Sequence, residues 1–517
     1  MIHAYGAREV YAAEADLMAR LPEGELMARA VEGLVAVTAA RIRERRARRV
    51  VGLIGTGNNG ADALYALARL AEAGHATAAV LTEKVHSGAY EDAVAAGVVL
   101  VSSVARPRLS HDLPDSSEMA EPNRAQDEPE APHDLPDSSE MAVAEVLGDA
   151  DIVLDGILGI GGRPEVPGFA RSWIEAIPAD AYVIAVDLPT GADPAGRAGD
   201  PDGVFADETV TFSVLKPVHL LPATEPRVGL LTVVDIGLEL TGSPQAERLD
   251  RDDVRDLWPV PEPSDHKYSR GVLGVIAGSA DFPGAAVLTT TAAVSAGVGM
   301  VRYIGPQRAT DHVVTAVPEV VHGLGQVQAW VIGSGLAQDI SRLDDDQSVA
   351  IDQALASDVP VLIDAGGLDV LADRGLQLRR GRPTILTPHA GECARLLGIE
   401  RATVDSDPVS HAEQLAQRTG AWVLLKGSVT LIVGPEQDHP VIAQADGPAW
   451  LATAGSGDVL SGLIGALLAG GLSPAIAGAL GALVHGVAAD DANPGGPIRA
   501  LDVAHQIPRT VGRLLRR

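Results

Sequence analysis

The segment 48–83 constrains the fold of this chain more than any other stretch. It reads as a buried apolar strand, RRVVGLIG, then a glycine-rich turn, a helix over ADALYALARLAEAG and a second strand over HATAAVLTE. Two strands joined by a helix in this way lie parallel in one sheet, and helices cover both of its faces. We therefore expect an α/β fold built on a parallel sheet.

Strands of this kind recur in two series. The first continues with ADIVLDGILGIG, AYVIAVDLPTG and DETVTFSVLKP, and the second has RGVLGVIAGS, AWVIGSGL, VPVLIDAGGL, TILTPHAGE and WVLLKGSVTLIVG. Between them, residues 240–271 are rich in Pro, Asp and Arg and lose the apolar periodicity. Because 517 residues are too many for one ordinary core, we expect two domains, over 1–245 and 250–517.

Composition excludes several classes of function. A formal net charge of -29 argues against binding to nucleic acid or to an anionic membrane. The lone Cys393 rules out an internal disulfide, and the charged first 24 residues do not resemble a secretory signal, so we expect a cytoplasmic protein. Residues 459–489 contain no Asp, Glu, Lys or Arg, but GGLSP interrupts them, which favours two buried helices over a membrane span.

An acidic segment interrupts the first domain. The ten residues HDLPDSSEMA occur at 111–120 and again at 133–142, and residues 111–145 hold 11 acidic side chains against the single Arg124. Few large apolar side chains are present to offset the entropy of ordering. We interpret 111–142 as a flexible insertion. An acidic docking segment is the alternative.

The glycine-rich turn GTGNNG at Gly55–Gly60 first suggests a nicotinamide-dependent dehydrogenase. Three features count against it: the pair Asn58–Asn59, Asp62 within the turn, and the later strand-end acids Asp155 and Asp187. A phosphate cradle needs backbone donors and no adjacent carboxylate. Asn, Asp and Thr oxygens from three loops suit a hard cation or a polyhydroxyl group, although caps and turns explain some of these residues equally well.

The motifs GTGNNGADAL, LDGILGIGGR, AVDLPTGADPAGR and ADETVTFSVLKP, in this order over about 50–220, resemble those of the NAD(P)H-hydrate epimerase domain. The resemblance implies a Rossmann-like domain in which Asp187 is the acid/base near the nicotinamide ring, with Lys216 as a weaker candidate for helping it. It also implies a potassium ion held by Asn59, Asp155 and Thr190. The residues implied to contact the hydrated nucleotide are Asn58, Asn59, Gly60, Ala61, Asp62, Gly159, Ile160, Gly161, Gly162, Arg163, Pro164, Glu165 and Asp187.

This chain departs from the usual epimerase pattern at three positions. The family usually has Gly at position 61, Ala at position 156 and Ser at position 190, where this chain has Ala61, Gly156 and Thr190. Threonine keeps the hydroxyl of serine, so the potassium site survives the third change.

Four signals meet in the second domain. GSGD at Gly455–Asp458 begins a helix whose N-terminal amides can hold a phosphoryl group. KGSVT forms a strand-turn-strand, TPHAGE places His389 at a strand end, and IGSGLA supplies Gly335 for close backbone approach. Together they resemble the ribokinase-like fold, in which the Asp after the glycine turn deprotonates a hydroxyl that attacks the γ-phosphate. A sugar or vitamin kinase fused to a Rossmann-like nucleotide-binding domain is therefore one possible function.

A more specific resemblance covers about 262–510. HKYSRGVLGVIAGSADFPGAA, LIDAGGLDVL, ILTPHAGECARLLG, LLKGSVTLIV and WLATAGSGDVLSGLIGALLAGG are similar to the ADP/ATP-dependent NAD(P)H-hydrate dehydratases. By this resemblance the hydrate contacts are Ala286, Gly335, His389 and Asp458, and the nucleotide contacts are Lys426, Gly427, Ser428, Val429, Thr430 and Gly457. The sequence does not decide between ADP and ATP. One departure is Gly366, where the family usually has a second acid after Asp364.

The chemistry of the hydrate suggests a role for Asp458. Its hydroxyl sits beside the ring nitrogen, and hydroxide is a poor leaving group because its conjugate acid has a pKa of about 15.7. We expect Asp458 to deprotonate this hydroxyl while the Gly455–Gly457 amides hold the transferring phosphoryl group, after which the ring nitrogen expels phosphate.

The fusion of the two domains makes sense as one repair pathway. Spontaneous hydration gives R and S epimers, and an epimerase would supply a dehydratase that accepts the S form. We expect hydrated NADH and NADPH and ADP (or ATP) as substrates, with potassium and magnesium as cofactors, in a homo-oligomer without nucleic-acid or membrane partners. A nucleotide sensor with degenerate sites is disfavoured because Asp187 and Asp458 are both present.

Overall fold

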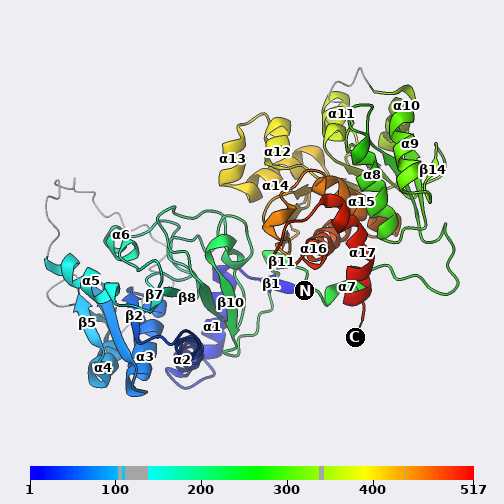
Figure 1. Cartoon of the computed structure of the whole chain (residues 1–517). Coiled ribbons are helices and arrows are strands. Elements are labelled where there is room, and N and C mark those ends of the chain that lie inside the picture. Colours follow the sequence, from blue (N-terminus) through cyan, green and yellow to red (C-terminus); the bar gives the residue numbers. More distant parts are fainter. Residues whose placement is uncertain (103–106, 111–137, 337–342, 437, 517) are drawn as a thin grey trace. The chain divides into compact units, whose positions relative to one another are not determined.

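The computed structural model describes residues 1–102, 107–110, 138–336, 343–436 and 438–516. The chain divides into an N-terminal unit, His3–Gln245, and a C-terminal unit, Ala246–Arg517 together with Met1–Ile2 (Figure 1). Most of the acidic insertion, residues 111–137, lies outside the described residues.

The N-terminal unit is built on a parallel sheet, as the sequence predicts. Its described strands pair in the order β10 (Leu230–Val234), β9 (Glu208–Phe212), β8 (Tyr182–Val186), β7 (Ile152–Gly156), β2 (Arg49–Ile54), β3 (Ala76–Leu81) and β5 (Val99–Ser102). A separate parallel pair joins β4 (Lys84–His86) and β6 (Arg108–Ser110). From β2 the chain builds outward to β3 and β5, then returns to β7 on the other side of β2. This reversal opens a crevice at the carboxyl ends of β2 and β7.

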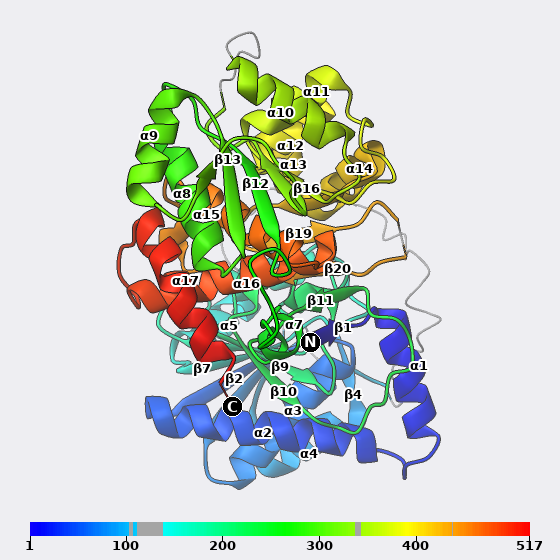
Figure 2. The ribbon, with the colours of Figure 1, turned by 90° about the vertical axis from the view of Figure 1, so that its right-hand side faces the viewer.

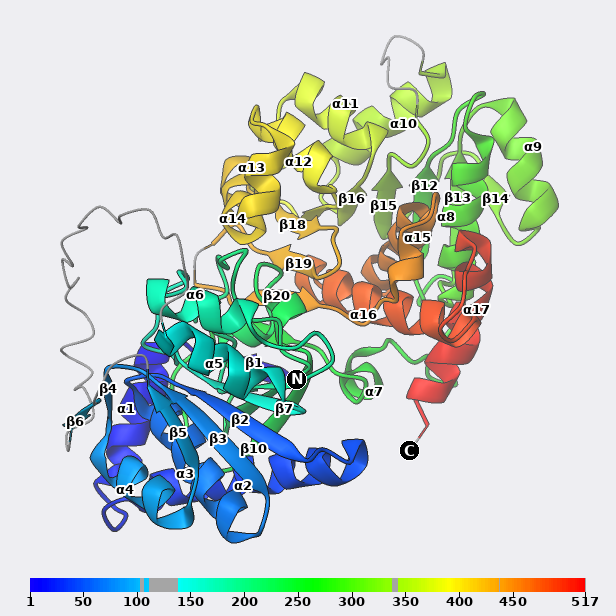
Figure 3. The same ribbon diagram turned by 60° about the vertical axis from the view of Figure 1, so that its left-hand side comes forward.

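Helices cover both faces of this sheet because successive residues of each strand point to opposite sides. Val50 and Ile54 of β2 join the core formed with α2 (Glu25–Arg45), α3 (Asn58–Glu72) and α4 (Ser87–Ala96). Val51 and Leu53 join a second core, formed with α5 (Ser138–Gly148) and α6 (Gly168–Glu175) (Figure 3).

Helix α5 corrects the boundary of the predicted insertion. Residues 138–142, assigned to it by composition, form the first turns of this helix. Val143, Val146 and Leu147 follow at helical spacing and are buried in the core. The helix that packs on the sheet therefore extends back into the second copy of the repeat, which composition alone does not reveal.

The C-terminal unit contains the larger sheet. One of its edge strands is β1 (Ile2–Ala4), of which only Ile2 belongs to this unit. In the described part of the chain the order continues with β11 (Ala246–Arg248), β20 (Val441–Gln444), β19 (Thr430–Val433), β18 (Trp422–Leu425), β17 (Thr384–Leu386), β16 (Val361–Ile363), β15 (Ala329–Ile332), β12 (Val272–Ile276), β13 (Met300–Ile304) and β14 (Val321–His322). From β18 to β14 all neighbouring strands are parallel, whereas β19 is antiparallel to β18 and β20.

Helices of this unit also lie on both sides of its sheet (Figure 2). Leu273 and Val275 of β12 face the core formed with α8 (Pro283–Ser295), α15 (Ser456–Ala469), α16 (Pro474–Ala492) and α17 (Ala500–Leu514), whereas α10 (Asp345–Ala356) and α14 (Pro408–Thr419) pack outside this core. The other described helices of this unit are α7 (Asp253–Leu257), α9 (Gln307–Ala316), α11 (Gly366–Arg374), α12 (Ala390–Leu397) and α13 (Arg401–Ser406), and a 3₁₀ turn lies at Ala449–Leu451. The N-terminal unit also contains α1 (Ala7–Met18) and 3₁₀ turns at Pro217–His219 and Glu225–Arg227.

The uncharged segment 459–489 forms two core helices, α15 and α16, as predicted. By length and composition α16 is long and apolar enough to cross a membrane, but 72% of its apolar window is buried inside the fold. Its apolar surface is thus accounted for by packing within the C-terminal unit.

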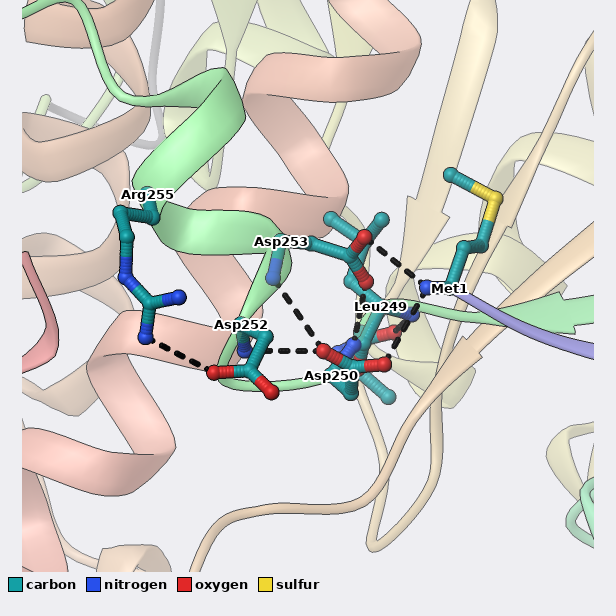
Figure 4. A network of polar contacts seen from close by, with 7 residues as sticks. Met1, Leu249, Asp250, Asp252, Asp253 and Arg255 are labelled. Carbon is teal, nitrogen blue, oxygen red and sulfur yellow. Dashed lines mark hydrogen bonds and ion pairs between the residues drawn. The ribbon is translucent and has the colours of Figure 1, made fainter. Parts of the chain in front are cut away.

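The first residue of the chain is bound to the C-terminal unit. The amino nitrogen of Met1 lies 3.1 Å from Asp250 Oδ2 and 2.9 Å from Asp253 Oδ1, beside the start of α7 (Figure 4). The Asp250 carboxylate also accepts a hydrogen bond from the backbone N–H of Asp252 at 2.8 Å.

Candidate active sites of the two units

A cavity of about 920 Å³ opens in the N-terminal unit at the carboxyl ends of β2, β7 and β8. Its walls come from the turn before α3, the loop after β7, and one face of α1. The sequence-predicted residues that line it are Asn58, Asn59, Asp62, Gly159, Ile160, Gly161, Asp187 and Lys216.

Other predicted contacts do not line this cavity. Gly60 and Ala61 are buried in the first turn of α3, where a Cβ on Gly60 would collide with Gly55 O, and Ala61 packs into the core. The remaining four continue the loop after β7 beyond the cavity: Gly162, Arg163, Pro164 and Glu165. The alanine at position 61 therefore replaces the usual glycine without entering the cavity.

Asp187 is held in an unusual conformation by three side chains. Its φ of +68° is in the left-handed region that a non-glycine residue rarely adopts. Oδ1 of Asp187 accepts hydrogen bonds from Lys216 Nζ at 2.5 Å and Thr211 Oγ1 at 2.8 Å. Nδ1 of His219 accepts from the backbone N–H of Lys216, so Nε2 carries the proton and donates to the Asp187 carbonyl at 2.8 Å.

These contacts decide the charge of Asp187. Burial acts to raise the pKa of this carboxyl, but the Lys216 ammonium and the hydrogen bonds from Lys216 and Thr211 hold it below its ordinary value. Burial lowers the pKa of His219 to about 4, so this imidazole is neutral near pH 7. Asp187 is therefore a fixed anion at neutral pH.

Two further acids share the cavity, and sequence analysis missed one of them. Burial raises the pKa of Glu14 to about 7, and the charge of Asp187 adds to the effect. Burial raises the pKa of Asp62 well above its usual range. Glu14 lies on α1, which carries no recognisable motif. The spacing of Tyr11, Glu14 and Met18 on one helix face was the signal available in the sequence.

The three residues predicted to hold potassium lie near one another: Asn59 lines the cavity and is linked through Leu158 to Thr190, which contacts Asp155. Asp155 accepts from Thr190 Oγ1 at 2.7 Å and from the backbone N–H of Thr190 at 2.8 Å. The Asn59 amide donates to Leu158 O at 3.0 Å and to Val186 O at 2.5 Å. Asp155 is fully buried, and burial raises the pKa of its carboxyl.

The surroundings of Gly156 explain a second departure from the family pattern. A Cβ at this position would lie 2.7 Å from Asn59 O and 2.8 Å from Ala63 Cβ. Glycine therefore lets the first turn of α3 lie directly against β7, which brings Asn59 close to Asp155.

In the C-terminal unit, Asp458 occupies the first turn of α15, as the GSGD motif predicts. The turn depends on Gly455, which has φ of +88° and where a Cβ would collide with Leu288. Burial and the charge of Asp364 raise the pKa of Asp458 to about 6, although Lys426 acts in the opposite direction. The carboxyl is thus able to accept a proton near neutral pH.

Asp364 and Lys426 form the polar centre beside it. Asp364 is buried at the end of β16 and accepts from Lys426 Nζ at 2.7 Å, Thr387 Oγ1 at 2.9 Å and Ser461 Oγ at 2.9 Å. Burial acts to lower the pKa of Lys426, but Asp364 and Glu392 raise it overall. The Asp364 carboxylate is satisfied by these donors.

The nucleotide-contact motif adopts the predicted strand-turn-strand. β18 and β19 are antiparallel, and Lys426, Gly427, Ser428 and Val429 connect them. Gly427 and Ser428 are exposed, whereas Val429 is buried. A Cβ built on Gly457 would lie 3.5 Å from Lys426 Nζ, so the turn and the start of α15 adjoin.

Three remaining predicted positions have structural roles of their own. His389 caps α12: its Nδ1 accepts from Glu392 N at 3.2 Å, and its own N–H donates to Glu392 Oε2 at 2.8 Å. Ala286 is fully buried in α8. Gly335 has φ of +68°, and a Cβ there would lie 2.6 Å from Ala285 Cβ, so the backbone approaches α8 closely.

The departure at Gly366 has a steric reason. A Cβ at 366 would lie 3.1 Å from Leu336 Cβ and 3.2 Å from Leu336 O. The preceding Ala365 has φ of +46°, which few non-glycine residues adopt. A larger side chain at 366 would need the chain around Leu336 to shift.

Comparisons with known proteins agree with this division. Residues 23–218 match the family model described as YjeF-related protein N-terminus, and residues 273–509 match that of NAD(P)H-hydrate dehydratase. The chain is 41% identical over 485 residues to the bifunctional NAD(P)H-hydrate repair enzyme Nnr of Mycobacterium tuberculosis, covering 91% of this chain and 90% of the relative. The Mycobacterium leprae enzyme of the same name is 40% identical over 510 residues, covering 96% and 95%.

A solved structure is also similar to part of the chain. It is the ADP/ATP-dependent NAD(P)H-hydrate dehydratase from Bacillus subtilis co-crystallized with ATP and Mg²⁺, which is 27% identical, with a TM-score of 0.45. The match covers 52% of this chain and 98% of that one.

The fold and the two sites define a two-domain α/β enzyme, Rossmann-like in the N-terminal unit and ribokinase-like in the C-terminal unit. Each unit places the acids of its strand-end motifs at the carboxyl ends of the parallel strands of its own sheet. The chain belongs to the family of bifunctional NAD(P)H-hydrate repair enzymes, since relatives of that name match it over almost its whole length.

Proposed function

We propose that this chain repairs hydrated NADH and NADPH in two steps. The N-terminal unit interconverts the R and S hydrates, and the C-terminal unit dehydrates the S form with ADP or ATP as phosphoryl donor. The observation that carries this proposal is the position of Asp458, a carboxyl with a pKa of about 6 in the first turn of α15. A proton acceptor at a helix N-terminus suits a hydroxyl that attacks a phosphoryl group.

The dehydration then proceeds in two stages. Asp458 takes the proton of the hydrate hydroxyl, whose oxygen attacks the terminal phosphorus as the nucleotide leaves. The backbone N–H groups at Gly455–Gly457 hold the phosphoryl oxygens. The lone pair of the ring nitrogen then expels phosphate, and loss of a proton from the neighbouring ring carbon restores the reduced nicotinamide.

The turn at Lys426–Thr430 and Gly457 would hold the nucleotide, and Ala286, Gly335 and His389 the hydrate. The exposure of Gly427 and Ser428 supports the first assignment. Magnesium would accompany the nucleotide phosphates and offset their negative charge.

In the N-terminal unit, Asn58, Asp62, Asp187 and the loop residues Gly159–Gly161 would bind the hydrate. Asn59, Asp155 and Thr190 fit potassium because they offer amide, carboxylate and hydroxyl oxygens. The buried Asp155 carboxylate also has no cationic partner among the ion pairs of the described residues. The ion would supply the missing positive charge and fix the loops that carry the site.

Hydrate repair is separable from the alternative, a sugar or vitamin kinase, by one experiment. Hydrated NADH and ADP or ATP are mixed with the full chain, and absorbance of the reduced nicotinamide is followed together with phosphate. Repair returns one NADH for each phosphate released. Stable phosphorylation of a sugar or vitamin alcohol, with the hydrate untouched, would establish the kinase instead.

The cellular setting is part of the same proposal. We expect a cytoplasmic homo-oligomer that acts on small molecules without nucleic-acid or membrane partners. The net charge of -29 supports the absence of an anionic polymer or membrane surface among them.

A further inference from the structure

One face of α1 lines the same cavity as Asp187. Tyr11, Glu14 and Met18 all line it from this helix, and Asp62 lines it from α3. The charges of Glu14, Asp62 and Asp187 act on one another, and the Lys216 ammonium acts on Glu14 as well. The cavity therefore brings three carboxyl groups and one ammonium group together around a single space.

The three carboxyl groups are held in different ways. Asp187 is bonded to Lys216 and Thr211 and is ionised at neutral pH, so it has no proton to give. Oδ1 of Asp62 is buried and has no hydrogen-bond partner among the described residues. Glu14 is only half-buried and lies on the cavity wall.

Epimerisation needs a group that both gives and takes a proton. The configuration inverts at the ring carbon that carries the hydroxyl, and hydroxide does not leave unprotonated, since its conjugate acid has a pKa of about 15.7. The pKa of about 7 suits Glu14 to this exchange at neutral pH. The charged or titratable groups that share the cavity with it are Tyr11 of α1, Asp62 and Tyr65 of α3, Asp187 after β8 and Lys216 after β9, with Glu23 and His86 also in the lining.

We propose that Glu14 is the catalytic acid and base of epimerisation and that Asp187 is a fixed anion in the same cavity; this inference rests on the proposed function of the unit. The Glu14 carboxyl donates its proton to the hydroxyl oxygen, the carbon–oxygen bond breaks, and water leaves. The ring nitrogen lone pair forms a carbon–nitrogen double bond, and Asp187 balances the resulting cation. Water then adds to the other face of the carbon and returns a proton to the Glu14 carboxylate.

The test measures interconversion of chromatographically separated R and S hydrates by the full chain. Glu14→Gln keeps the shape of the side chain but cannot exchange the proton, so the rate is expected to fall about 10²-fold or more. For the wild type, kcat/KM is expected to fall above pH about 7, because the acid must be protonated. This alkaline limb is expected to vanish in the variant, which a purely structural role would not produce.

A chemical rescue and a matched control sharpen the test. Formate should restore part of the rate of Glu14→Ala by entering the vacated space as a replacement acid. Asp16→Asn removes an exposed carboxylate from the same helix, outside the cavity, and should stay within threefold of wild type. If Glu14→Gln does not fold, Glu14→Asp replaces it, and its alkaline limb must move with the new carboxyl.

Two results overturn the proposal: a Glu14→Gln rate within threefold of wild type, or an alkaline limb that stays in place in the Glu14 variants. Either result leaves the proposed function intact as long as the wild type interconverts the epimers. A wild type that does not interconvert them would instead count against the proposed function of the unit.

Discussion

The ammonium group of Lys426 lies 2.7 Å from the carboxylate of Asp364, and the two charges act on Asp458 in opposite directions. Asp364 raises the pKa of Asp458 and Lys426 lowers it, while burial makes the largest contribution. This pair thus tunes the group that we propose as the base of the dehydration.

Loss of the carboxylate at 458 should stop dehydration while leaving epimerisation intact. Asp458→Asn preserves size but cannot take the proton, so we expect NADH formation to fall by about 10² or more. Equilibration of R and S hydrates should continue, because Asp187 belongs to the other unit. Absorbance and epimer chromatography on the same sample measure both activities, and equal losses in the two would contradict separate sites.

Removing the charge of Lys426 and removing the charge of Asp364 should move the pH profile of dehydration in opposite directions. A base works when deprotonated, so wild-type dehydration should fall as pH drops through about 6. Lys426→Met removes a positive charge and should move this acidic limb to higher pH, whereas Asp364→Asn should move it lower. The midpoint of kcat/KM against pH is the readout, since it does not depend on how far either change weakens nucleotide binding. Shifts in the same direction would refute the tuning role.

Asp155→Ala should remove the potassium dependence of epimerisation. The variant loses the carboxylate that meets Thr190, so the proposed ion site loses its negative charge. Rates in potassium and in a large organic cation are compared for wild type and variant. Dehydration of pure S hydrate serves as the internal control and should not change. A variant that still responds to potassium would place the ion elsewhere.

Replacing His485 should stabilise the C-terminal unit increasingly as the solution becomes acidic. Burial lowers the pKa of this histidine to about 4, and its buried Nε2 has no hydrogen-bond partner in the described part of the chain. The unfolded chain binds its proton near pH 6.5, so the folded state loses stability as pH falls from 6.5 toward 4, by up to about 1.4 kcal/mol per pH unit. Urea unfolding of wild type and His485→Met can be monitored by the loss of dehydratase activity. The free energy of unfolding of the variant should exceed that of wild type by more at pH 5 than at pH 7. A stability difference that does not change with pH would exclude this link between His485 protonation and folding.

Deletion of the acidic segment should depend sharply on where it stops. Removing 111–137 should leave both activities within a few-fold, because its composition provides little apolar surface to bury. Extending the deletion through Leu147 also removes Val143 and Val146 from the core and should unfold the N-terminal unit. Thermal melting and the epimerase assay on the two variants test this contrast, and equal behaviour would contradict the assigned boundary.

Local patterns were enough to predict each strand-turn-helix unit. Apolar runs followed by glycine predicted β2 with α3, and GSGD predicted the start of α15, because these features depend on residues adjacent in the chain. The strand-turn-strand at Lys426–Thr430 follows from equally local signals. The helical start of α5 at Ser138 was missed, since composition averages over a window that includes the insertion before it.

The sequence by itself determined the two α/β units, the family and the two acids after their glycine-rich or strand-end motifs, since all of these reside in short contiguous patterns. Tertiary structure alone decided which charges meet. Glu14 reaches the cavity only because α1 packs near the carboxyl ends of β2 and β8, and Lys216 neutralises Asp187 only because the chain turns back after β9. The proton-transfer properties of a carboxyl depend on burial and on charges a few ångströms away, and those neighbours are set by folding rather than by position in the chain.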